Sequence, residues 1–122
     1  MSFSVRIWLT VALAGAVWAP PAQAHAILVD SQPAALAIIP AGEATFRLRY
    51  NSRIDSARSR ISLVRAGAAD TVLPLGRDDP PELLTTRAVL DAGAYTLRWQ
   101  VLAIDGHITR GDLPFTVAPA AK

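Results

Sequence analysis

Two histidines occur in the chain, His25 and His107, and each stands where it can bind a metal ion. If the chain is cut after Ala24, His25 becomes the first residue and carries a free α-amino group. That amine and the imidazole Nδ1 of the same residue can close a chelate ring on one ion. Two preassembled nitrogen ligands suit the tetragonal geometry that Cu(II) prefers.

The second histidine lies in the segment Ile104-Asp105-Gly106-His107. Asp105 and His107 are two residues apart, so in extended backbone their side chains leave the same face. Gly106 between them allows the backbone to turn without a steric cost. Together with His25 they would supply three nitrogens and one carboxylate oxygen to one Cu(II) ion. Considered alone, each histidine is also compatible with an exposed residue that binds no metal ion.

The amino-terminal segment has the three parts of a secretory signal peptide. Residues 1–6 carry one positive charge, residues 7–18 form an apolar run, and Ala22-Gln23-Ala24 ends the segment with small residues two apart. The apolar run is shorter than the roughly 20 residues that span a bilayer. We therefore expect residues 1–24 to be removed as a signal peptide. Residues 25–122 would then form one periplasmic domain with no membrane span.

Composition excludes several classes of site. The chain has no cysteine, so disulfides, thiolate metal ligands and cysteine nucleophiles are absent, and the domain must depend on its apolar core. Lys and Arg number 12 against 10 Asp and Glu, which is a small surplus. Arg47 and Arg49 alternate with apolar residues, a pattern typical of a solvated strand face. We expect no nucleic-acid partner.

Extended segments separated by turns make up the rest of the chain. In 44–50 apolar and polar residues alternate with a period of two, so Phe46, Leu48 and Tyr50 should face a core. Residues 34–39 have a helical composition but are bracketed by prolines. The segments expected to be strands are 26–29, 44–50, 60–65, 71–75, 83–90, 94–102 and 113–117. About seven short strands without a convincing helix predict an all-β sandwich.

One turn has a more specific signature. The segment 90–95 resembles a tyrosine corner, in which the Tyr95 hydroxyl ties a strand start to the preceding loop. We therefore interpret Tyr95 as structural and not as catalytic.

Short motifs also occur in a definite order along the chain. They are an amino-terminal His-Ala, a Ser-x-Pro-Ala element, a Gly-x-Tyr-x-x-x-Trp strand, an Asp-Gly-His turn and a closing Gly-x-x-x-Phe-x-Val. The matching residues are His25-Ala26, Ser31-Gln32-Pro33-Ala34, Gly93, Tyr95 and Trp99, Asp105-Gly106-His107, and Gly111, Phe115 and Val117. These motifs extend over nearly the whole of residues 25–122. In them, this part of the chain resembles the CopC-like periplasmic copper-binding proteins.

The resemblance implies an Ig-like, Greek-key β-sandwich with one Cu(II) ion at one end. It implies that His25 (through its amine and imidazole), Asp105 and His107 are the ligands. A protein of this kind would not be an enzyme. It would sequester or deliver copper, as part of copper homeostasis and resistance, and an inner-membrane copper transporter is the partner to expect.

Two departures from the family pattern bear on the site. Some relatives hold Cu(I) through a methionine-rich segment, because soft thioethers suit that ion. The single methionine here is Met1, which would leave with the signal peptide, so we expect no Cu(I) thioether site. Ala103 stands where relatives commonly have serine, which removes one possible hydrogen bond beside the ligands.

Two other functions remain open from the residues alone. The first is a metal-free Ig-like interaction module, because β-sandwiches host many functions. The second is a copper-dependent oxidative enzyme, since an amino-terminal histidine also binds copper in polysaccharide-cleaving enzymes. Against the second, Asp105 would occupy a coordination position that oxygen chemistry needs open. A hydrolase is disfavoured because no serine stands in a recognisable nucleophile motif.

Overall fold

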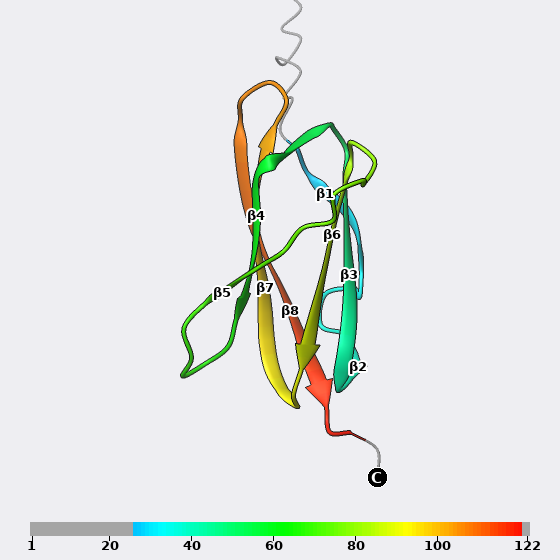
Figure 1. Ribbon diagram of the computed structural model, residues 1–122, viewed down its shortest axis with the longest axis vertical. Coiled ribbons are helices and arrows are strands. Elements are labelled where there is room, and N and C mark those ends of the chain that lie inside the picture. The colour runs from blue at the N-terminus through cyan, green and yellow to red at the C-terminus, as the bar shows by residue number, and fades with distance from the viewer. Residues whose placement is uncertain (1–25, 121–122) are drawn as a thin grey trace, which may run out of the picture.

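Eight strands in two sheets make up the residues that the computed structural model describes, 26–120 (Figure 1). The strands are β1 (Leu28–Gln32), β2 (Ile38–Pro40), β3 (Gly42–Tyr50), β4 (Ile54–Val64), β5 (Thr71–Leu73), β6 (Leu83–Leu90), β7 (Gly93–Ala103) and β8 (Ile108–Ala118). The expected all-β sandwich is confirmed, with one strand more than the seven predicted. Across residues 26–120 there is no helix that could cross a membrane.

The two sheets differ in size and share one core. The smaller sheet has the order β1-β3-β6, and the larger has the order β2-β8-β7-β4-β5. Neighbouring strands are antiparallel, except that β2 runs parallel to β8. Figure 1 shows the β7–β8 turn, the β3–β4 loop and the start of β1 at one end of the sandwich. Strand β8 ends at Ala118, at the opposite end.

The alternation predicted for residues 44–50 is confirmed by burial. Phe46, Leu48 and Tyr50 are at most 2% exposed, whereas Arg47 and Arg49 lie in the solvent. The reason is the two-residue period of a strand, which sends successive side chains to opposite faces of the sheet. One face of β3 therefore lies in the core and the other in water.

Aromatic rings join the two sheets across this core. Phe46 of β3 lies 5.2 Å from Phe115 of β8, measured between ring centroids. Tyr50 meets Trp99 of β7 edge to face, with centroids 5.3 Å apart and an angle of 74° between the rings. Offset and edge-to-face contacts of this kind add to the free energy gained by burying apolar area. Because no cysteine is present, this packing takes the place of disulfides.

The strand absent from the prediction is β2, within the segment of helical composition. Leu36 has φ of 66°, a left-handed conformation that ends a right-handed helix. The amide of Ala37 bonds to the carbonyl of Ala34 at 3.1 Å, and the amide of Thr116 to the carbonyl of Ala37 at 2.9 Å. The segment thus makes one turn and then joins the edge of β8. Pairing with a distant strand, and not local propensity, decides its conformation.

The tyrosine corner is confirmed. The Tyr95 hydroxyl donates to the carbonyl of Asp91 at 2.8 Å. Arg65 adds two bonds that the sequence did not predict, from Nη1 to the Tyr95 hydroxyl at 3.0 Å and from Nη2 to the carbonyl of Ala92 at 3.1 Å. Gly93 begins β7 with φ of 151°, a region that favours glycine. These contacts fix the start of the strand that leads to the Asp-Gly-His turn.

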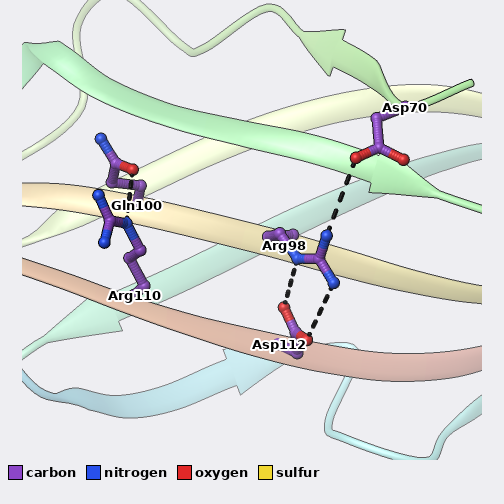
Figure 2. A network of polar contacts seen from close by, with 5 residues as sticks. All are labelled: Asp70, Arg98, Gln100, Arg110 and Asp112. Carbon is purple, nitrogen blue, oxygen red and sulfur yellow. Dashed lines mark hydrogen bonds and ion pairs between the residues drawn. The ribbon is translucent and has the colours of Figure 1, made fainter.

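Arginines on the outer face of the larger sheet are matched by carboxylates. Arg98 donates through Nε to Asp112 at 3.0 Å, and its Nη1 lies 3.8 Å from Asp70 (Figure 2). The hydrogen bond with Asp112 raises the pKa of the Arg98 guanidinium. Arg110 donates to the Gln100 side chain at 2.8 Å. These contacts make the face a polar, solvated surface of the kind that alternating arginines indicate.

Candidate metal centre

The Asp-Gly-His segment forms the tight turn between β7 and β8. The amide of Ala103 donates to the carbonyl of His107 at 2.8 Å, and the amide of Gly106 donates to the carbonyl of Ala103 at 2.9 Å. Gly106 has φ of 93°. A three-residue hairpin loop that ends in a left-handed glycine has this pattern of bonds. Gly106 is therefore needed for its backbone conformation, as the sequence indicated.

The turn brings Asp105 and His107 into direct contact. The His107 amide donates to Asp105 Oδ1 at 3.1 Å, and His107 Nδ1 lies 2.9 Å from Asp105 Oδ2. The spacing predicted side chains on one face of extended backbone, and the extended backbone is wrong, because the two residues lie in a turn and contact each other there. They meet because the carboxylate accepts from the amide two residues later, as in an Asx turn, and not because the backbone is extended.

This contact gives the imidazole a defined orientation in an open position. The His107 side chain is 60% exposed and that of Asp105 is 28% exposed. When Nδ1 donates its proton to a carboxylate, the lone pair of the ring lies on Nε2 and points away from that carboxylate. Carboxylates hold metal-binding histidines in this way in many proteins, which fixes the tautomer and makes the ring a better ligand.

Three segments are tied together around this turn. The amide of Ile104 donates to the carbonyl of Arg53 in the β3–β4 loop at 3.2 Å. In the same loop, Asn51 Oδ1 accepts from the amide of Ile27 at 2.8 Å, and the amide of Asn51 donates to the carbonyl of Ile27 at 3.0 Å. Ala26 is fully buried against the core. The start of the described chain and the turn therefore lie at one end of the sandwich (Figure 1).

His25 lies outside the described residues, so the predicted ligand set is described in part. Asp105 and His107 lie together, and Ala26, the neighbour of His25 in the chain, lies at the same end of the fold. Within residues 26–120 there is no group of three or more His, Cys, Asp and Glu side chains that could hold a metal ion.

The donors that are present suit a borderline metal ion. An imidazole nitrogen beside a carboxylate oxygen fits Cu(II) or Zn(II).

Buried hydroxyl groups also lie on the segments that lead to this end. Tyr50 Oη, Ser52 Oγ and Thr109 Oγ1 have no hydrogen-bond partner in the described structure. Burial raises the pKa of Tyr50, so this hydroxyl stays protonated.

The β3–β4 loop was missed by the sequence analysis. Asn51 bonds to Ile27, and Arg53 accepts from the amide of Ile104, although each pair is far apart in the sequence. The only local signal was a polar Asn-Ser pair after a strand, which indicates a turn and nothing more. Contacts between residues this far apart leave no periodicity for a sequence reading to detect.

Comparison with known proteins agrees with the fold. A family model for the CopC domain matches residues 28–118. The crystal structure of CopC from Methylosinus trichosporium OB3b is similar, with a TM-score of 0.69 and 31% identity, covering 80% of this chain and 98% of that one. The protein YobA of Escherichia coli strain K12 is 28% identical over 121 residues, 96% of this chain and 94% of its own length.

A second solved structure supports the fold alone. It is PcoC, a methionine-rich copper-resistance protein from Escherichia coli, with a TM-score of 0.65. The identity is 22%, and the match covers 77% of this chain and 99% of that protein. The family match covers all eight strands, and it includes the turn that carries Asp105 and His107.

Proposed function

The chain belongs to the CopC family of copper-binding proteins, and from this premise we propose that it captures one Cu(II) ion in the periplasm. The observation that carries the proposal is the contact of Asp105 with His107 on an exposed turn. That turn lies at the end of the sandwich where the described chain begins. A ligand at the mature amino terminus would therefore enter the fold at the same end as Asp105 and His107.

The proposed ligands are His25, Asp105 and His107. His25 would bind through its α-amine and its imidazole, which requires that residues 1–24 are removed as a signal peptide. Two ligands from one residue form a chelate, so much of the entropy of assembling the site is already lost in the free protein. Asp105 would both orient His107 and supply an oxygen to the ion.

The proposed action is capture and release, without chemical turnover. Amines and imidazoles bind copper only when they are deprotonated, so protons compete with the ion and acidification favours release. Residues 25–122 contain no methionine, and a thioether site for Cu(I) is therefore not part of the proposal. Ile104 and Ile108, which flank the turn, are 72% and 53% exposed. Exposed apolar side chains beside a site favour contact with a protein that receives the copper, such as an inner-membrane transporter.

The proposal is tested by titrating Cu(II) into the chain that begins at His25, with a competing chelator to measure affinity. Placing a methionine before His25 keeps the imidazole but moves the amine. This change and His107→Ala should each weaken Cu(II) binding by orders of magnitude, since a bidentate ligand or one of four donors is lost. Asp112→Ala, on the outer face of the larger sheet, is the matched control and should bind as the parent chain does.

Two results would contradict the proposal. Equal affinity with and without the added methionine would exclude the amine as a ligand. Failure of the parent chain to bind Cu(II) would leave a metal-free interaction module. Mass spectrometry of the exported protein tests the same premise independently, because a mature chain that begins elsewhere than His25 lacks the chelate.

A further inference from the structure

We propose that Asn51 is a positioning residue for the copper site, which holds the amino-terminal segment at a fixed place beside the β7–β8 turn. This inference rests on the proposed function. Asn51 is not offered as a ligand. It would act through Ile27, two residues from His25 in the chain, and its effect would be to preorganise the chelate.

The evidence is a closed pair of hydrogen bonds between Asn51 and Ile27. The Ile27 amide donates to the Asn51 side chain at 2.8 Å, and the Asn51 amide donates to the Ile27 carbonyl at 3.0 Å. The last backbone pair of β1 with β3 is Leu28 with Tyr50. Asn51 therefore extends this ladder by one residue, with its side-chain oxygen in the place of a backbone carbonyl.

Apolar packing alone does not hold this segment. Ile27 is 54% exposed, so about half of this residue stays in solvent. Ala26 is fully buried, but it is small and contributes one methyl group to the core. The bonds to Asn51 are thus the main tie on Ile27, and without the side-chain acceptor one of the two is lost.

The same loop also holds the other half of the proposed site. Arg53, two residues after Asn51, accepts from the amide of Ile104, the residue before Asp105. Two residues span at most about 7 Å of chain. The loop from Asn51 to Arg53 therefore sets the separation between Ile27 and the turn. His25, also two residues from Ile27, is limited to the same reach of about 7 Å.

A loosened segment must be ordered again each time copper binds. Fixing the backbone of a residue costs conformational entropy, so losing the Asn51 acceptor should weaken Cu(II) binding about tenfold. Asn51→Asp keeps an acceptor oxygen at the same place. It should bind Cu(II) as tightly as the parent chain, or more tightly because of the added negative charge.

The experiment compares four chains that all begin at His25: the parent, Asn51→Ala, Asn51→Asp and the control Gln100→Ala. Gln100 also has an amide that accepts one hydrogen bond, but from Arg110 on the outer face. Three properties are measured: Cu(II) affinity by chelator competition, the Cu(II) electron paramagnetic resonance spectrum, and hydrogen exchange of the Ile27 amide without metal. We expect Asn51→Ala to show faster exchange at Ile27, about tenfold weaker binding and a spectrum with more than one copper environment. Asn51→Asp, which keeps the acceptor oxygen, should resemble the parent in exchange and spectrum and bind Cu(II) at least as tightly.

The outcomes separate this inference from the proposed function. If the parent chain binds Cu(II) and Asn51→Ala exchanges faster at Ile27 but binds with unchanged affinity and spectrum, Asn51 is merely structural and the inference is wrong. If the parent chain does not bind Cu(II), the proposed function fails and the inference fails with it. Should Asn51→Ala not fold, Asn51→Gln replaces it, because its longer side chain displaces the acceptor. Parent-like affinity in that variant would equally overturn the inference.

Discussion

Tyr50 shows how one residue can combine favourable and unfavourable contacts. Its ring is 2% exposed and packs edge to face on Trp99, which accounts for its place in the core. Its hydroxyl has no hydrogen-bond partner in the described structure. A buried polar group without a partner costs free energy, and the same desolvation raises the pKa of Tyr50.

Removing this hydroxyl should therefore not lower the free energy of unfolding. Tyr50→Phe keeps the ring and should leave the free energy of unfolding at pH 7 unchanged or raise it by about 1 kcal/mol. Because the folded-state pKa is raised, the hydroxyl ionises first in the unfolded chain, near pH 10. Below pH 10 this ionisation therefore has no effect on the free energy of unfolding. Above pH 10 the free energy of unfolding falls as the pH rises, because the unfolded chain ionises before the folded protein does. Urea denaturation at pH 7 and pH 11 should show the parent losing stability relative to Tyr50→Phe.

A matched comparison is available in Tyr95→Phe. Its hydroxyl donates to Asp91 and accepts from Arg65, so its loss should cost about 1–3 kcal/mol at pH 7. A similar loss in Tyr50→Phe would mean that the Tyr50 hydroxyl is hydrogen-bonded in solution, and the argument from burial would be wrong.

At the scale of elements, the β7–β8 hairpin carries two of the three residues of the proposed site, and it carries Trp99 of the core. Its register is continuous from Gly93 with Val117 to Leu102 with Ile108. Trp99 stands opposite Gly111 in this register, and a Cβ at Gly111 would lie 2.3 Å from Trp99 Cζ2. The glycine is therefore required by the indole ring that covers it, and not by its own backbone conformation.

Gly111→Ala should lower the free energy of unfolding by about 1–3 kcal/mol, because the core must shift to make room for the methyl group. The control is Trp99→Phe, which removes the indole atoms nearest to that methyl group. In a double-mutant cycle measured by urea denaturation, the cost of Gly111→Ala should be smaller in the Trp99→Phe background. Additive costs would show that the indole is not the cause.

How far the sequence predicts these elements depends on how local their causes are. The alternation in β3 is a property of neighbouring residues, so this strand and its buried face were predicted, and β7 was predicted as a strand. Strand β2 was not, because a three-residue strand held by β8 has no periodicity of its own. The sequence predicted a turn at Gly106 and side chains of Asp105 and His107 on one face, but it did not predict the hydrogen bonds that join these two residues. Asn51 was missed because its partners are distant in the sequence, and the role of His25 stays a prediction.

At the scale of the whole molecule, the proposed site would join the two sheets. Ile27 precedes β1 of the smaller sheet, whereas the turn belongs to β7 and β8 of the larger one. In the described residues the two sheets are held together by core packing and by loop hydrogen bonds such as that from Ile104 to Arg53. A copper ion bound to both sides would add a cross-link to a protein that has no disulfide.

Copper should therefore stabilise the fold. With free Cu(II) at 100 times the dissociation constant, linkage predicts a gain of about 2.7 kcal/mol in the free energy of unfolding. For a domain of this size that gain corresponds to a rise of roughly 10–20 °C in Tm. Thermal denaturation at a buffered Cu(II) concentration should show the rise, and EDTA should reverse it. The chain with a methionine before His25 is the control, and an equal rise in that chain would assign the effect to copper bound elsewhere.

Strand β8 runs away from its turn and ends at Ala118, about as far from Asp105 and His107 as the sandwich allows (Figure 1). A fluorophore, affinity tag or surface anchor attached by the carboxyl end would leave the β7–β8 turn and the β3–β4 loop open to solvent. The same attachment at the amino end would block the amine of His25. Measurements of copper exchange with immobilised protein should therefore use carboxyl-terminal coupling, which presents every molecule with the end that carries the proposed site outward.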